Sequence, residues 1–149
     1  AGPAAVDSPG AMLALRASAL PAVLVAPLLT GVMSAIPARV RATASLAVAA
    51  VAALLLPSAS GDVVALGALL FVFVGGVALG SPGLVASIHG RAGGSVGAAT
   101  ALYTASLFLG ASVGPQVVAA LGGFTPTLLA TGGILAVAAG LVWISTRGD

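Results

Sequence analysis

The chain has 149 residues, of which 60% are hydrophobic and 5% are charged, and its mean hydropathy is +1.23. A soluble domain carries about 25% charged residues because its surface must face water, so this composition excludes a soluble globular domain. The absence of cysteine excludes disulfides and thiolate metal sites, and a net charge of +2 excludes a nucleic-acid-binding surface.

Apolar segments of membrane-spanning length follow one another along the chain. A bilayer core of about 30 Å requires about 20 apolar residues in a helix, and the segments cover residues 12–36, 42–57, 63–88, 95–121 and 127–146. Backbone polar groups in lipid must be satisfied within a helix or a closed barrel, and no segment alternates as barrel strands do. We therefore predict an all-α, polytopic membrane protein with about five transmembrane helices.

The charged side chains predict an orientation. By helix parity, one side of the membrane carries these basic residues: Arg39, Arg41, His89, Arg91 and Arg147. The other side carries Asp7, Asp62 and a single arginine, Arg16. The positive-inside rule then predicts a multi-pass protein of the bacterial inner membrane with a cytoplasmic C-terminus.

The segments differ in the size and polarity of their side chains. Segment 42–57 has polar residues only at its start, Thr43 and Ser45, and the centre of the last segment, 134–144, has none. We expect both helices to face lipid. Small residues share one face in the third segment, at Gly76 and Gly80, and in the fourth, at Gly110 and Gly114 beside Pro115. Such faces predict close helix packing, either static or as a surface on which helices move during a transport cycle.

The third segment contains the sequence Gly80-Ser81-Pro82-Gly83, which predicts a break in the helix. A break at membrane depth is either a simple kink or an opening at a binding site. The candidates for a substrate pathway are the polar residues beside it and on the fourth segment: Ser81, Pro82, Ser87, Tyr103 and Ser106. Each of these also has a purely structural interpretation as a hydrogen bond or a kink.

Catalytic constellations are missing from the sequence. There is one histidine and no glutamate, and no aspartate lies within a predicted span. A membrane-embedded enzyme needs clustered ligands or an acid–base pair inside the bilayer. We therefore predict no enzymatic activity, no metal and no cofactor.

Nearly the whole chain resembles the C-terminal end of the major facilitator superfamily, especially bacterial drug or sugar efflux permeases, and the motifs that carry the likeness lie in residues 75–123. The likeness rests on Gly75-Gly76-Val77-Ala78-Leu79-Gly80-Ser81-Pro82, on the Gly97-Ala98-Ala99-Thr100-Ala101-Leu102-Tyr103 stretch, on Leu109-Gly110-Ala111-Ser112-Val113-Gly114-Pro115, and on Gly122-Gly123. The resemblance implies that the five spans are helices eight to twelve of a twelve-helix transporter. It also implies that helices nine and twelve, the second and fifth spans, lie outermost, and that helix ten, the third span, lines a central cavity.

The resemblance also implies a function and a partner. It suggests a secondary active efflux permease that moves a small-molecule substrate by alternating access, and whose N-terminal half is missing from this segment. Two departures weaken the likeness: the acid and first arginine of the family's loop pattern are absent after Gly31, and the Gly-Gly pair expected after Gly114-Pro115 is displaced. The alternative is a non-catalytic membrane subunit that anchors or scaffolds a complex.

Overall fold

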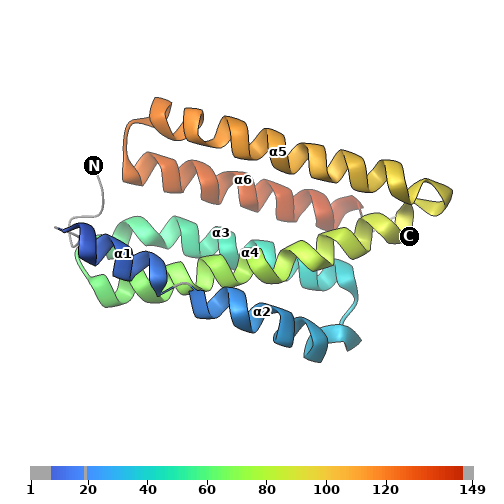
Figure 1. Ribbon diagram of the computed structural model, residues 1–149, viewed down its shortest axis with the longest axis horizontal. Helices are drawn as coiled ribbons and strands as arrows, with labels where there is room; N and C mark the ends of the chain where they lie inside the picture. The colour runs from blue at the N-terminus through green and yellow to red at the C-terminus, as the bar shows by residue number, and fades with distance from the viewer. Residues whose placement is uncertain (1–7, 19, 146–149) are drawn as a thin grey trace.

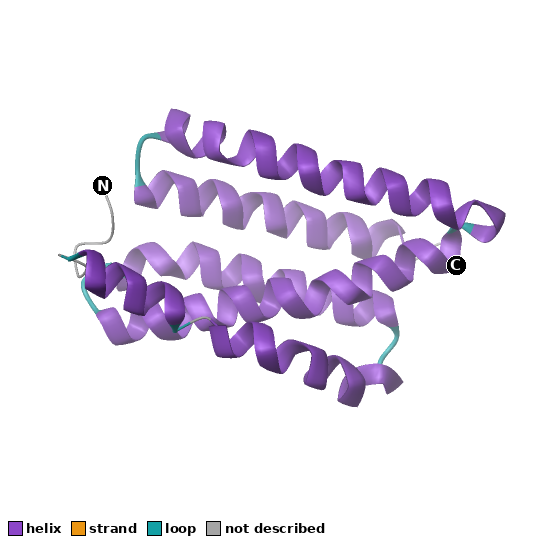
Figure 2. Cartoon of the chain, viewed as in Figure 1, coloured by secondary structure: helices purple, strands orange, loops and turns teal. Residues whose placement is uncertain are grey.

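The computed structural model describes residues 8–18 and 20–145, and within these residues every regular element is a helix (Figures 1 and 2). The long helices are α3 (Ala38–Leu55), α4 (Val63–Arg91), α5 (Val96–Leu121) and α6 (Phe124–Ser145). Shorter elements are α1 (Pro9–Ala17), α2 (Leu20–Val32) and the 3-10 turns η1 (Met33–Ala35), η2 (Leu56–Ala59) and η3 (Gly93–Ser95). The all-α fold class predicted from composition is confirmed.

The first predicted span, 12–36, consists of two helices instead of one. Ser8 caps α1, its Oγ accepting a hydrogen bond from the Ala11 N–H at 3.1 Å. Pro21 has no N–H to donate to the carbonyl of Ala17, where α1 ends. The second piece, α2, has 13 residues and is about 20 Å long, too short to cross a bilayer alone. Both pieces lie along α4 (Figure 1).

Helix α4 runs without interruption through the predicted break, so that prediction was wrong. Pro82 withholds one donor, from the carbonyl of Ala78, and the rest of the 29-residue helix keeps its hydrogen-bond ladder. Asp62 starts the helix, its Oδ1 accepting from the N–H groups of Val64 at 2.8 Å and Ala65 at 3.2 Å. One missing bond in a long helix packed on a neighbour is not enough to unwind it.

Helix α3 lies between α4 and α6 and supplies more buried residues than any other described helix (Figure 1). The expectation that this second span faces lipid, as the outermost helix nine, is therefore wrong for the described chain. Its buried positions are mostly alanines, with Ser45 and Leu46 among them. Small side chains allow helices to approach closely, and this packing drives association in lipid, where apolar character alone does not.

Helices α5 and α6 form a hairpin beside this core (Figure 1). Gly122 ends α5 in the left-handed conformation at φ +68°, which a side chain would disfavour. Helix α6 packs on α3 through Gly132, whose added Cβ would lie 2.7 Å from Leu54 Cγ. This contact corrects the expectation that the fifth span faces lipid alone. Helix α5 buries no residue.

Four helices of the described chain, instead of the five predicted, are long and apolar enough to cross a membrane: Ala38–Ala59, Val63–Arg91, Gly93–Leu121 and Phe124–Ser145. Their boundaries differ from the predicted ones by a few residues, chiefly because α3 begins at Ala38 and α4 continues to Arg91. The chain is a multi-pass membrane protein.

Candidate functional site

The small residues predicted on the third span lie against α3. A Cβ built on Gly76 would be 2.9 Å from the Ser45 carbonyl oxygen and 3.0 Å from the Ala49 Cβ. At Gly83 the corresponding distances are 3.1 Å to the Ala38 carbonyl oxygen and 3.1 Å to the Ala42 Cβ. The two helix backbones therefore meet directly: a side chain at Gly76 would force them apart, and one at Gly83 would fit only with a small shift of the neighbouring atoms.

Gly80 lies between these two contacts and is buried, but a Cβ there would meet the Ser45 Cβ at 3.5 Å, an ordinary contact distance. The close contact between α3 and α4 thus depends on Gly76 and Gly83 more than on Gly80. The helical spacing of the sequence places Gly83 on the same face as Gly76 and Gly80, and the structure confirms that this face meets α3.

The corresponding face of α5 has no partner in the described chain. Nothing lies within 4 Å of a Cβ built on Gly110 or Gly114, and Pro115 is exposed within an uninterrupted helix. The expected packing of these residues against a neighbouring helix is not found there. The spacing of small residues is the same as in α4, but α5 lies at the edge of the bundle, where no described helix covers it.

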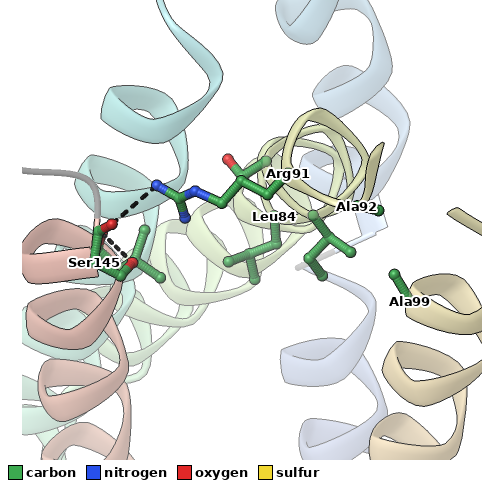
Figure 3. A pocket seen from close by; sticks show the side chains of 8 residues that line it. Leu84, Arg91, Ala92, Ala99 and Ser145 are labelled. Atoms are coloured by element: carbon green, nitrogen blue, oxygen red, sulfur yellow. Dashed lines mark hydrogen bonds between the residues drawn. The ribbon is translucent and has the colours of Figure 1, made fainter. Parts of the chain in front are cut away.

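A groove opens between α4, α5 and α6 at the end of the bundle where α4 and α6 finish. It has a volume of 350 Å³, and we call it the Arg91 groove after the residue at its rim (Figure 3). Its lining residues are Leu84, Ser87, Ile88, Arg91, Ala92, Ala99, Val142 and Ser145. The Arg91 side chain crosses to α6, where Nη2 donates to the Ser145 carbonyl oxygen at 3.1 Å. A cation at the carbonyl end of a helix is favourably placed.

A second, smaller cavity lies between α4 and α5 and contains Tyr103. This Tyr103 pocket has a volume of 170 Å³ and is lined by Val85, Ile88, His89, Thr100, Tyr103 and Thr104. Ile88 also lines the Arg91 groove, so one side chain borders both cavities.

Hydrogen bonds beside the Tyr103 pocket connect the end of α4 to the start of α5. Thr100 Oγ1 lies 2.9 Å from the Val96 carbonyl oxygen and 2.9 Å from His89 Nε2. When the hydroxyl proton of Thr100 is donated to the Val96 carbonyl, the hydroxyl oxygen accepts from His89, and the proton of the neutral imidazole is then on Nε2.

The five predicted pathway residues do not form one site. Ser87 lines the Arg91 groove and Tyr103 lines its own pocket. Ser81 and Ser106 donate to carbonyls of their own helices, Val77 at 3.0 Å and Leu102 at 2.9 Å. Pro82 is exposed on α4 and lines neither cavity.

Arg41 is a buried polar residue whose structural role the sequence did not reveal. It is 8% exposed at the start of α3, and its Nη1 donates to the Met33 carbonyl of η1 at 3.0 Å. Its Nε is buried without a hydrogen-bond partner in the described chain, as is Thr43 Oγ1. The usable signal was its place inside the first turn of an apolar helix, where an arginine is costly unless it is bonded.

Comparisons with protein-family models, with curated proteins and with solved structures find no match to this chain. Among the described residues, no three histidine, aspartate or glutamate side chains gather into a group that could hold a metal ion.

Proposed function

We propose that this chain is part of a secondary active transporter of the major facilitator type, which moves a small molecule across the membrane by alternating access and carries out no enzymatic reaction. The multi-pass helical fold supports the proposal. So does the place of the residues that resemble this superfamily, which fall on α4, on α5 and on the turn after α5. The proposed location is the bacterial inner membrane with a cytoplasmic C-terminus.

The observation that carries the proposal is the Tyr103 pocket. In a chain with 5% charged residues, His89, Thr100, Tyr103 and Thr104 come together at one cavity. Three of them lie in α5, a candidate membrane-spanning helix, where polar groups are costly and are found facing a partner or an aqueous cavity. Within the described residues the Tyr103 hydroxyl has no hydrogen bond, so it is available to a substrate that carries a polar group.

The packing of the helices supports movement at this pocket. Helix α3 packs closely on α4 and α6, whereas α5 has no buried residue and meets the others along cavities. Displacement of α5 would open or close the Tyr103 pocket without breaking the α3–α4 contact. In this proposal the N-terminal half of the transporter is the partner that covers the exposed face of α5.

The test is transport by the complete gene product that contains these residues. Cells expressing it are loaded with ethidium and with a panel of other fluorescent dyes, and efflux is followed with and without a protonophore. We expect efflux of at least one dye, abolished by the protonophore. Tyr103→Phe and Thr104→Val should raise the apparent KM several-fold at unchanged abundance.

Thr131→Val is the matched control, because it removes one hydroxyl from α6 that bonds its own helix at the Thr127 carbonyl. It should leave dye efflux unchanged. If no panel compound is moved, and the protein instead co-purifies in fixed ratio with other membrane proteins, the scaffold alternative holds. That alternative is favoured by one observation, the uncovered face of α5.

A further inference from the structure

We propose that the Arg91 groove is a binding site for an anionic phospholipid, with an acyl chain in the groove and the phosphate at Arg91. This assignment goes beyond transport and does not depend on it. It rests on the depth of Arg91 in the membrane, on the charge at this end of the bundle and on the lining of the groove.

The length of α4 places Arg91 among the lipid headgroups. A helix of 29 residues is about 43 Å long, whereas the hydrocarbon core is about 30 Å thick and the whole bilayer about 40–45 Å. One end of α4 is capped by Asp62 and the other ends at Arg91. If the helix is centred in the bilayer, its last turn lies outside the hydrocarbon and level with the phosphates.

The charge at this end is entirely positive in the part of the chain that the structure describes. Arg39 and Arg41 lie in the first turn of α3, which packs beside Gly83 of α4, and His89 and Arg91 follow in the last turns of α4. The only described carboxylate, Asp62, caps the opposite end of α4. Residues 146–149, outside the described part, carry one arginine and one aspartate, whose charges cancel. A phosphate is the complementary charge for such a surface.

The lining of the groove suits a hydrocarbon chain. The walls of the groove are formed by Leu84 and Ile88 of α4, Ala99 of α5 and Val142 of α6, and Figure 3 shows the Leu84 side chain pointing into the space between the helices. The volume of 350 Å³ lies within the range of about 300–1,000 Å³ typical of ligand sites. An apolar cleft with a cation at its mouth matches a phospholipid better than a water-soluble ligand, because lipid fills the space around the cleft.

Trp143 provides a direct probe. It is the only tryptophan of the chain, it follows the groove residue Val142, and it is 43% exposed. The protein is reconstituted in vesicles of phosphatidylcholine brominated on its acyl chains, which quench tryptophan on contact. Unbrominated phosphatidylglycerol or unbrominated phosphatidylcholine is then added, and the recovery of fluorescence gives the relative binding of the two lipids next to Trp143.

We expect phosphatidylglycerol to bind about fivefold better than phosphatidylcholine, the effect of one basic residue at the membrane surface. Arg91→Gln should reduce the ratio to about one. Arg39→Gln removes the same charge from the same end of the bundle but not from the groove, and it should leave the ratio nearly unchanged. Helix content and elution as a single species establish that each variant is folded.

A steric pair keeps the proposal testable if Arg91→Gln does not fold. Ala99→Leu fills the groove and should lower the ratio to about one, whereas Ala98→Leu, at the next position outside the lining, should not. Equal binding of the two lipids by the unmodified protein would overturn the proposal. Equal effects of Arg91→Gln and Arg39→Gln, or of the two leucine variants, would also overturn it, because they would show a general surface potential and no site.

Discussion

The contact between α3 and α4 predicts that adding one methyl group at Gly76 destabilises the bundle. In Gly76→Ala the new Cβ would lie 2.9 Å from the Ser45 carbonyl oxygen and 3.0 Å from the Ala49 Cβ. The closer of these atoms belongs to the backbone, so relief requires α3 and α4 to separate. Overpacking of this kind costs about 1–3 kcal/mol. Replacing a glycine within a helix returns about 0.5–1 kcal/mol, so the expected net loss is about 1–2 kcal/mol.

Gly75→Ala is the matched control, one residue away on the same helix. Its Cβ would lie 3.7 Å from the Ala22 Cβ, an ordinary contact, so only the helix propensity changes and stability should stay equal or rise. Unfolding is measured by titrating sodium dodecyl sulfate into mixed micelles and following helix content. The reasoning is refuted if Gly76→Ala proves as stable as Gly75→Ala.

The nature of the neighbouring atoms matters more than their distance. At Gly132 a Cβ would come closer still, 2.7 Å from Leu54 Cγ and 2.8 Å from Leu54 Cδ2. These two atoms belong to a flexible side chain, which can rotate away without moving a helix, and the nearest backbone atom, the Ala50 carbonyl oxygen, is farther away at 3.2 Å than the backbone oxygen at Gly76. Gly132→Ala should therefore cost less than Gly76→Ala in the same titration. A larger loss of stability for Gly132→Ala than for Gly76→Ala would show that the distance to the nearest atom alone sets the cost of the added methyl group.

Three further substitutions test separate parts of the structure. Asp62→Ala should lower stability by about 1 kcal/mol through loss of the α4 cap, while Asp62→Asn retains most of it in the same unfolding titration. Nitrogen-15 NMR should show that neutral His89 carries its proton on Nε2, and Thr100→Val should abolish this preference. An Nδ1–H tautomer in the unmodified protein would contradict the assigned hydrogen bond. Gly110→Leu should leave the stability of this chain unchanged, since nothing lies within 4 Å of that position; a marked loss would mean that α5 is covered.

The existence of the long helices could be predicted from sequence because length and apolarity are what the bilayer requires of a spanning segment. The ends of α5 fall within one residue of the predicted 95–121. The close-packing face of α4 was also accessible, since Gly76, Gly80 and Gly83 recur at helical spacing. The break of the first span was harder to predict, because Pro21 and Pro27 both suit a kinked single helix as well as two helices.

The burial of α3 could not be predicted from its hydropathy. Lipid and protein interior are equally apolar, so an alanine-rich helix is compatible with both. The sequence feature that indicated burial of α3 was the small size of the side chains on one of its faces. Ala42, Ser45 and Ala49 recur at helical spacing and contact the glycines of α4. Hydropathy does not reveal this face, because it treats alanine only as a hydrophobic residue and not as a small one.

The same spacing on α5 indicates a surface but not its partner. Gly110 and Gly114 repeat the pattern of Gly76 and Gly80, and yet they contact no other helix in the described chain. A face of small residues allows the backbone of another helix to approach closely. Which helix packs there depends on which helices are present.

Helix α4 connects the features on which both proposals depend. One face is held against α3 at Gly76 and Gly83, and other faces border the Tyr103 pocket and the Arg91 groove. Ile88 lines both cavities, so neither can change width at this point without affecting the other. A lipid in the groove would hold α5 away from α6 and would thereby influence the pocket where α4 meets α5. In the proposed mechanism the close α3–α4 contact holds α4 in place, and α5 is the element that moves.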